Sequence, residues 1–295
     1  MRDAPALAGL VESLEARAFP DLDLWVAVAK GADARTMGGA ADVALGLGAG
    51  TTREDAETRA LGECLERLGA ALVPDGTPPG VPARTFSGSP AGWVPAARVY
   101  LPYRDALGPV LPATSEGLAF AFDRQTACLR AGLELIERVA LRDALSAGHR
   151  TLRTEGEQSC GKHTSTLYRL PAPMPVILAV LADPWGRISG AGSAADPDPQ
   201  AAAERAVREA ALAHLAAEGE VLPGSIGPGD ALLAPFGVRM LRDLRTTGIQ
   251  LPEQEDFTPA GTFDALGIVF ADATPPAFRS FGGVVFRALR GRRHA

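Results

Sequence analysis

Two stretches of this sequence share the pattern Glu-x-x-Glu-Arg, which could place a metal-binding pair of carboxylates on a helix. The first covers residues 63–67, with Glu63, Glu66 and Arg67, and the second covers residues 134–138. Residues three apart lie on one face of an α-helix, so each pair of glutamates would point the same way. Adjacent carboxylates repel each other unless a cation or an arginine neutralises them. Gathered carboxylate oxygens suit Mg²⁺, which proteins commonly hold against the phosphates of ATP.

A third segment matches the first two when the sequence is aligned on Glu63, Glu134 and Glu209. In all three copies, alanine stands seven and three residues before the aligned glutamate, and arginine stands four residues before it. The third copy has Leu212 where the others have a second glutamate. Stretches of small residues ("GLGAG", "SEGLAFA" and "SGAGSAA") precede the copies, which predicts an internal repeat of a loop followed by a helix. Solvated helix faces with local ion pairs, or an ancestral repeat without a site, are the alternatives.

Strands and long helices alternate along the chain, which predicts an α/β or α+β fold with a substantial sheet. The long helices are expected at about 52–71, with Thr52 as N-cap, and at 123–147 and 198–218. A shorter helix is expected at 5–17, and exposed or glycine-rich connections at 74–92 and 186–199. Strands are expected at 23–31, 42–50, 174–183, 264–274 and 283–289, with a strand pair at 93–103. No break in composition divides the chain, so residues 1–295 are expected to form a single domain.

Composition excludes several classes of function. The chain has 295 residues and a formal net charge of -6, so bulk electrostatics would not attract nucleic acid. The basic run at 287–294, "RALRGRRH", is interpreted as a solvated C-terminal tail. No stretch approaches the roughly 20 apolar residues needed to cross a bilayer. The N-terminus lacks a signal-peptide pattern, and three cysteines do not suggest a disulfide framework, so a cytoplasmic protein is expected.

Other candidate sites carry less weight. Cys160 and His163 have the spacing of a metal-ligand pair, but a zinc site needs about four ligands and the remaining Cys and His residues are scattered. His214 could approach a ligand from the third helix, although a packing role is more common for such a histidine. The G-x-G at 48–50 lacks the third glycine and the acidic ribose partner of a dinucleotide-binding fingerprint.

At these repeated motifs the sequence resembles the YcaO family. The segment "GAGTTREDAETRALGECLERLGA" (48–70) resembles the family's first ATP-site segment, and "TSEGLAFAFDRQTACLRAGLELIERVALRDAL" (114–145) resembles its second. The segment "GAGSAADPDPQAAAERAVREAA" (190–211) is similar to its third. The similarity spans about residues 20 to 290. It implies a YcaO-type fold in which mixed sheets and long helices carry the loop-helix repeat.

The resemblance implies that ATP and Mg²⁺ are the cofactors and assigns residues to them. The magnesium ligands would be five glutamates: Glu63, Glu66, Glu134, Glu137 and Glu209. Arg67 and Arg138 would hold phosphate or orient those carboxylates. Gly48, Gly50 and Ser115 would belong to segments that border the nucleotide. Within this set, Glu63, Glu134 and Arg138 are the catalytic candidates.

The resemblance also implies an activity. Family members use ATP to convert a peptide amide oxygen into a phosphate, and a nucleophile then adds to the amide carbon. A Cys, Ser or Thr side chain gives an azoline, sulfide gives a thioamide and an amine gives an amidine. The phrase "ALGECLERL" is more similar to the azoline cyclodehydratase branch. The substrate would be a ribosomally made precursor peptide. A separate leader-peptide-binding or TfuA-like protein is the expected partner, and a homodimer stays open.

Some residues depart from the family pattern and keep a second hypothesis open. Glu116 stands where asparagine is usual, Phe120 and Phe122 replace small residues, and Val139 replaces aspartate. In the third helix, the family's usual Gln-Ser-Arg is replaced by Leu212, Ala213 and His214. The second hypothesis is a catalytically degenerate scaffold or peptide-binding subunit of a modification complex. This second hypothesis is favoured if the two phenylalanine rings fill the nucleotide pocket.

Overall fold

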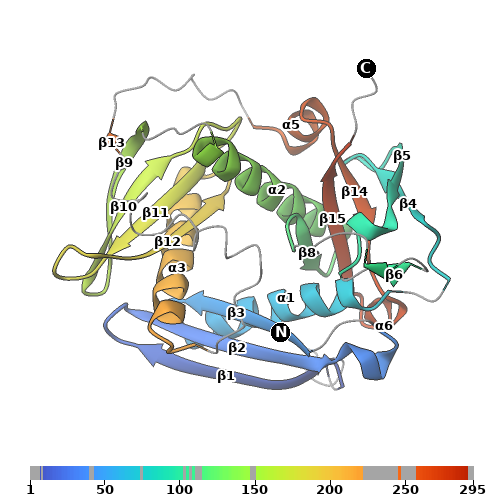
Figure 1. The fold of residues 1–295 in the computed structure, drawn as a ribbon, viewed down its shortest axis with the longest axis horizontal. Helices are drawn as coiled ribbons and strands as arrows, with labels where there is room; N and C mark the ends of the chain where they lie inside the picture. The colour runs from blue at the N-terminus through green and yellow to red at the C-terminus, as the bar shows by residue number, and fades with distance from the viewer. Residues whose placement is uncertain are drawn as a thin grey trace.

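Three sheets and three long helices make up most of the described chain. The computed structural model describes residues 7, 9–39, 43–73, 76–101, 104–105, 108–109, 115–146, 151–221, 245–246 and 257–291. Each long helix packs on a sheet of its own, and the helices lie in the middle of the molecule with the sheets around them (Figure 1). The predicted α+β class with mixed sheets is therefore confirmed.

The first sheet contains three antiparallel strands, β1 (Val11–Phe19), β2 (Leu24–Asp33) and β3 (Val43–Gly50). Strands β2 and β3 confirm the strands expected at 23–31 and 42–50. The helix expected at 5–17 is wrong, because residues 11–17 belong to β1; residues 5, 6 and 8 lie outside the described part. Pairing along β2 supplies β1 with backbone hydrogen bonds over its length, and such pairing overrides a weak helical pattern.

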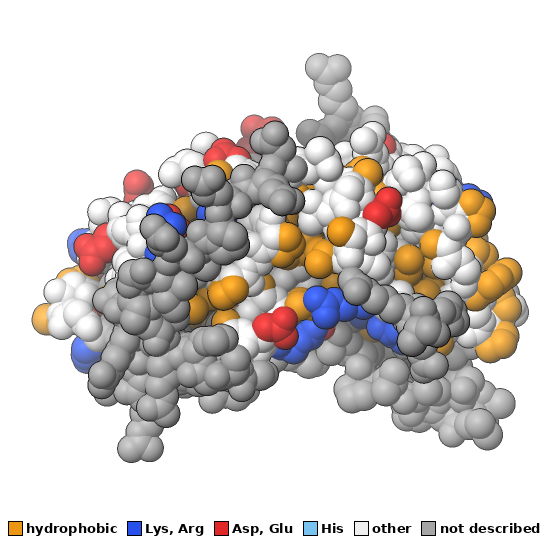
Figure 2. Space-filling model, turned by 90° about the horizontal axis from the view of Figure 1, so that it is seen from above, with side chains coloured by type: hydrophobic (Ala, Val, Ile, Leu, Met, Phe, Trp, Pro, Cys, Tyr) orange, Lys and Arg blue, Asp and Glu red, His pale blue; other side chains and the backbone are white. Residues whose placement is uncertain are grey.

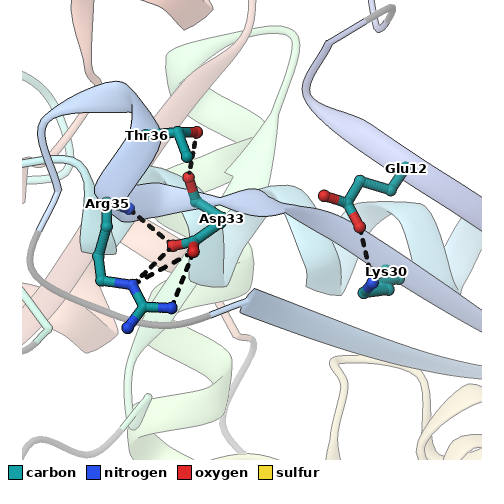
Figure 3. A network of polar contacts seen from close by, with 5 residues as sticks. All are labelled: Glu12, Lys30, Asp33, Arg35 and Thr36. Carbon is teal, nitrogen blue, oxygen red and sulfur yellow. Dashed lines mark hydrogen bonds and ion pairs between the residues drawn. The ribbon is translucent and has the colours of Figure 1, made fainter.

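A polar network closes the end of β2 (Figure 3). Asp33 caps the 3-10 helix η2 (Ala34–Met37) by accepting hydrogen bonds from the backbone and guanidinium of Arg35, and Thr36 Oγ1 donates to its carbonyl oxygen. Beside it, Lys30 Nζ lies 2.7 Å from Glu12 Oε2 across β1 and β2. Exposed ion pairs of this kind stabilise a fold by less than about 1 kcal/mol each. The network therefore orients the exit from β2 rather than holding the sheet together.

The second sheet has the order β12-β11-β10-β9-β13. Its strands are β9 (Thr151–Cys160), β10 (His163–Arg169), β11 (Val176–Ala182), β12 (Ile188–Ala195) and β13 (Arg245–Thr246). All pairs are antiparallel except β13 with β9. Strand β11 confirms the buried strand expected at 174–183, whereas β12 occupies the connection expected at 186–199. The hairpin of β9 and β10 was not predicted.

The third sheet has the order β5-β4-β14-β15-β8 and is antiparallel throughout. Its strands are β4 (Gly80–Arg84), β5 (Pro90–Pro95), β8 (Leu118–Ala121), β14 (Ile268–Asp272) and β15 (Val284–Arg290). Strands β14 and β15 confirm the last two expected strands.

Two expectations around this sheet are wrong. The connection expected at 74–92 contains β4 and the start of β5, and the strand pair expected at 93–103 is replaced by the end of β5 and the 3-10 helix η3 (Ala96–Arg98). Residues 74–75 and 102–103 lie outside the described part. The remaining short elements are β6 (Arg104–Asp105), β7 (Gly108–Pro109), α5 (Pro259–Ala265) and α6 (Pro276–Arg279).

The three long helices confirm the sequence prediction. They are α1 (Arg53–Ala71), α2 (Arg124–Ser146) and α3 (Pro199–Ala217). Thr52 caps α1, since its side chain accepts a hydrogen bond from the Asp55 amide at 3.1 Å. Each helix follows a strand at the edge of its own sheet, namely β3, β8 and β12. The repeated unit is therefore a strand followed by a helix, not a loop followed by a helix.

Glycines in two of these strands let the following helix approach closely. A Cβ added to Gly192 in β12 would lie 2.5 Å from Glu209 Cβ and 2.6 Å from the carbonyl oxygen of Ala206 in α3. A Cβ on Gly48 in β3 would lie 2.8 Å from Arg59 Cβ in α1. Real Cβ atoms do not approach other atoms this closely, so close packing explains why glycine and alanine repeat in register.

The repeats also contact one another in a closed order. Helix α1 packs against β8, α2 against β12, and α3 against β3, so each helix contacts its own strand and the strand of another repeat. Three hydrophobic clusters, which include residues of α1, α2 and α3 respectively, form the core. That residues 1–295 form a single domain stays a prediction, which this ring of contacts supports.

Candidate metal and nucleotide site

Glu63 and Arg67 connect α1 to β3. One carboxylate oxygen of Glu63 accepts a hydrogen bond from the Leu47 amide at 2.5 Å, and the other lies 2.5 Å from Arg67 Nη2. Arg67 Nη1 also donates to the Leu45 carbonyl oxygen at 2.8 Å. The predicted role of Arg67 in orienting a carboxylate therefore fits this geometry. Its predicted contact with phosphate stays a prediction.

Glu66 lies one turn further along α1, where several charges converge. Burial, followed by the nearby carboxylates of Glu134 and Glu63, raises the pKa of Glu66 well above its usual range. The guanidinium groups of Arg67 and Arg287 act in the opposite direction. Glutamates from the first two repeats thus share one electrostatic environment. The excess of negative charge there is what a divalent cation would relieve.

On α2, an arginine lies between two glutamates. Arg138 Nε is 3.9 Å from Glu134 Oε1 and 4.0 Å from Glu137 Oε1. Glu137 is only 6% exposed and accepts a hydrogen bond of 2.7 Å from Ser193 Oγ in β12. A buried carboxylate needs such a partner. The second repeat is therefore joined to the strand of the third through a predicted site residue.

Glu209 on α3 is exposed and lies beside Gly192 of β12. The next residue of β12 after Gly192 is Ser193, whose hydroxyl donates a hydrogen bond to Glu137. Leu212, which replaces the second glutamate of the repeat, is buried in an apolar cluster with Leu47 packed against it. The third copy therefore contributes one carboxylate at its helix and an apolar contact at the next position.

The described residues do not hold a complete set of metal ligands in this conformation. Within those ranges, no group of three or more His, Cys, Asp or Glu side chains is arranged to hold a metal ion. Cys160 and His163 face each other across the hairpin of β9 and β10, but no third ligand of this kind joins them within the described ranges. Mg²⁺ usually takes one or two protein carboxylates and completes its shell with phosphates and water. The carboxylates therefore fit a metal that arrives with a nucleotide, not a preformed protein cage.

The phenylalanines that depart from the family pattern lie on strand β8 and directly after it. Phe120 is buried in the core, with its ring centroid 6.0 Å from that of Phe278. Phe122 packs on Phe120 but is 58% exposed. One ring thus belongs to the core, and the other lies largely at the surface.

The other departures are also accommodated locally. Glu116 accepts two hydrogen bonds from Arg142, at 2.6 and 2.7 Å, so its added charge has a counter-ion. Val139 lines an apolar hollow on the face of α2 that is opposite to Glu134. The carbonyl oxygen of Ser115 accepts from the Leu118 amide in the turn before β8. Contacts of Gly48, Gly50 and Ser115 with a nucleotide stay predictions.

One functional candidate was missed because it was assigned to the tail. Arg287 lies within β15 and is only 5% exposed, so the interpretation of the run 287–294 as solvated is wrong for this residue. Residues 292–294 lie outside the described part. The strand expected at 283–289 gives a sequence signal for this position. Residues two apart in a strand share a face, so Arg287 lies on the same face as the apolar residues Val285 and Leu289.

Figure 2 shows one face of the molecule, on which Lys and Arg side chains gather next to acidic side chains near the centre. Within the described residues, no helix has the length and apolar character to span a bilayer.

Comparisons with known proteins agree with this architecture. The family model described as YcaO cyclodehydratase, ATP- and Mg²⁺-binding, matches residues 74–225, which include α2 and α3. A comparison with curated protein sequences finds no match. The structure of YcaO from Methanopyrus kandleri bound with AMPPCP and Mg²⁺ is 19% identical, with a TM-score of 0.68 over 98% of this chain and 88% of that one.

Two further structures share the fold. A heterocyclase in complex with substrate and cofactor is 15% identical, with a TM-score of 0.67 over 97% of this chain and 50% of that one. A chain of the E. coli microcin synthetase McbBCD complex is 12% identical, with a TM-score of 0.60 over 94% and 87%. The predicted family, fold and cofactors are confirmed: the chain belongs to the YcaO family of ATP-dependent, Mg²⁺-binding enzymes.

Proposed function

We propose that this protein uses ATP and Mg²⁺ to activate a backbone amide of a ribosomally made precursor peptide. The product would be an azoline, a thioamide or an amidine. The observation that carries this proposal is the electrostatic convergence of Glu63, Glu66 and Glu134, which come from two helices of the repeat. Arg138 between Glu134 and Glu137 adds a positive group at the edge of the same cluster.

The residues present fit the proposed cofactors. Glu66 and Glu134 are the side chains whose charges a cation would balance, and Glu63 and Glu137 keep helices α1 and α2 fixed to β3 and β12. Glu209 would contribute from α3. When bound, Mg²⁺ and ATP supply the phosphoryl group that makes the amide oxygen a leaving group. Catalysis of this kind depends on positioning and on neutralising charge at the phosphoryl group.

The class of nucleophile is proposed from the sequence. The phrase "ALGECLERL" at the end of α1 is more similar to azoline cyclodehydratases, so a Cys, Ser or Thr of the substrate is the favoured nucleophile. Burial raises the pKa of the enzyme's own thiols, to about 12 for Cys64 and Cys128 and about 11 for Cys160. Thiols with such pKa values are poor nucleophiles at neutral pH. The attacking group would therefore come from the substrate.

A peptide substrate and a partner protein are also proposed. The similar heterocyclase was solved with its substrate, and the similar microcin synthetase was solved as a complex and with pro-MccB17 bound. By analogy, this chain would act on a precursor peptide with a separate leader-peptide-binding or TfuA-like protein. A homodimer and a cytoplasmic location stay predictions.

The alternative is a degenerate scaffold or peptide-binding subunit. Leu212 favours it, because the third repeat has lost its second carboxylate to an apolar contact.

Reconstitution with a candidate precursor peptide and a candidate partner separates the two hypotheses. The peptide is incubated with protein, Mg²⁺ and ATP, and its mass and the released phosphate are measured. Loss of one water indicates an azoline or amidine, and exchange of oxygen for sulfur indicates a thioamide. Omission of ATP is the control. A protein that binds the peptide but neither binds nucleotide nor releases phosphate would be the scaffold.

A further inference from the structure

Arg287 stands out because a charged side chain occupies a core position of a central strand. Strand β15 lies between β14 and β8, and its side chains alternate between two faces. Val285 and Leu289, the neighbours of Arg287 on its face, belong to the hydrophobic cluster that also contains residues of α1. A buried charge is costly unless other groups compensate for it. This position therefore needs an explanation beyond packing.

Packing between α1 and β15 places Arg287 at the carboxylates. A Cβ added to Gly69 of α1 would lie 2.6 Å from Val285 Cγ2, so the helix and strand are in direct contact there. Glu66 is one helical turn before Gly69, and Arg287 is two residues beyond Val285 on the same strand face. Consistent with this, Arg287 interacts electrostatically with three carboxylates, those of Glu134, Glu116 and Glu66.

Two of the three guanidinium nitrogens of Arg287 have unused hydrogen-bonding capacity among the described residues. Its Nε and Nη1 atoms are buried and have no hydrogen-bond partner among the described residues. Unpaired buried donors cost roughly 1–3 kcal/mol each, so native proteins rarely retain them without a function. Burial lowers the pKa of Arg287 from its usual value, and the three carboxylates oppose this shift. The group stays charged, because arginine is effectively always protonated in proteins.

We propose that Arg287 binds a phosphate group of the nucleotide, as a positively charged donor on β15 that faces the glutamates of α1 and α2. A guanidinium is well matched to phosphate oxygens, and its Nε and Nη1 donors would gain acceptors when the nucleotide is present. This assignment rests on the proposed function. The site residues predicted from the sequence motifs all belong to the three repeats. Arg287 would add a residue of strand β15 to that site.

The test measures binding of the non-hydrolysable analogue AMPPCP with Mg²⁺ by calorimetry. Arg287→Gln should weaken binding by about 10- to 100-fold, the value of one charge-assisted hydrogen bond. Arg290→Gln, on the same strand but exposed, is the control and should bind as the wild type does. Thermal unfolding confirms that each variant is folded.

A second variant separates phosphate binding from simple neutralisation of the carboxylates. Arg287→Gln combined with Glu116→Gln removes one charge of each sign, so the net charge of the cluster is kept, and Glu116 is not a predicted ligand. If Arg287 binds phosphate, the double variant should remain about 10-fold or more weaker than the wild type. Recovery of wild-type affinity in the double variant, or unchanged affinity in the single variant, would overturn the assignment. If the wild type itself binds no nucleotide, the proposed function fails instead.

Discussion

Replacement of Glu66 by glutamine should stabilise the protein without ligand and remove its response to nucleotide. Burial and the carboxylates of Glu134 and Glu63 raise the folded-state pKa of Glu66 above its unfolded value. Its carboxyl therefore favours the unfolded state increasingly as pH rises from that unfolded value towards the folded one. Glutamine keeps the shape of the side chain without the charge. The variant should unfold at a higher temperature than the wild type at pH 8, and the difference should shrink as the pH approaches 4.5.

The response to ligand can be given a magnitude. Nucleotide at 100 times its dissociation constant stabilises the folded state by about 2.7 kcal/mol. The entropy of unfolding of a chain this long is about 0.6 kcal/mol/K, so the wild-type Tm should rise by about 4 °C with Mg²⁺ and ATP. In the Glu66→Gln variant the cluster loses the negative charge of one predicted ligand, and an amide oxygen attracts Mg²⁺ much more weakly than a carboxylate, so most of this rise should disappear.

Differential scanning fluorimetry at several pH values, with and without Mg²⁺ and ATP, measures both effects. Glu54→Gln is the matched control, because Glu54 is an exposed residue in the first turn of the same helix. The control should shift with nucleotide as the wild type does. If Glu66→Gln is less stable than the wild type at pH 8 without ligand, or keeps the full nucleotide shift, the argument from crowded carboxylates is refuted.

Three further outcomes are expected. Glu134→Ala should abolish phosphate release, measured colorimetrically in the reconstituted reaction; unchanged turnover would remove Glu134 from the site. Gly48→Ala should destabilise the protein by about 1–3 kcal/mol, because the new methyl group meets α1, whereas Gly62→Ala, with open space around it, should stabilise it by up to about 1 kcal/mol. Chemical unfolding compares the two, and equal effects would contradict the close strand-helix packing. The thiols should not react with an aromatic disulfide reagent at pH 8 until the protein is unfolded; the residues concerned are Cys64, Cys128 and Cys160.

The helices and their alignment could be predicted from the sequence because their signals are local. The Thr52 cap and the apolar periodicity define α1, and the three register-matched copies indicate that the helices are equivalent. The paired carboxylates of the first two copies also indicated that the copies meet. Neighbouring carboxylates repel each other unless a cation or an arginine balances their charge.

The errors arose where the cause is tertiary. The segment before α3 has the glycines and serine of a loop, yet it forms β12, because α3 packs directly on Gly190 and Gly192. Strand β1 has a pattern compatible with a helix, and its pairing with β2 decides the outcome. The burial of Arg287 depends on β15 lying between β14 and β8. The alternation of Val285, Arg287 and Leu289 indicates that the three share one face, but not that another element covers this face.

The central claim is that glutamates of α1 and α2 hold the metal of a bound nucleotide. Crystals of the full chain grown with AMPPCP and Mn²⁺, a substitute for Mg²⁺ with a measurable anomalous signal, test it most directly. We expect anomalous density at about 2.0–2.2 Å from an oxygen of at least one glutamate of each helix, with Glu66 and Glu134 the first candidates. A nucleotide bound with its metal touching only phosphates and water, or a metal outside this cluster, would contradict the account.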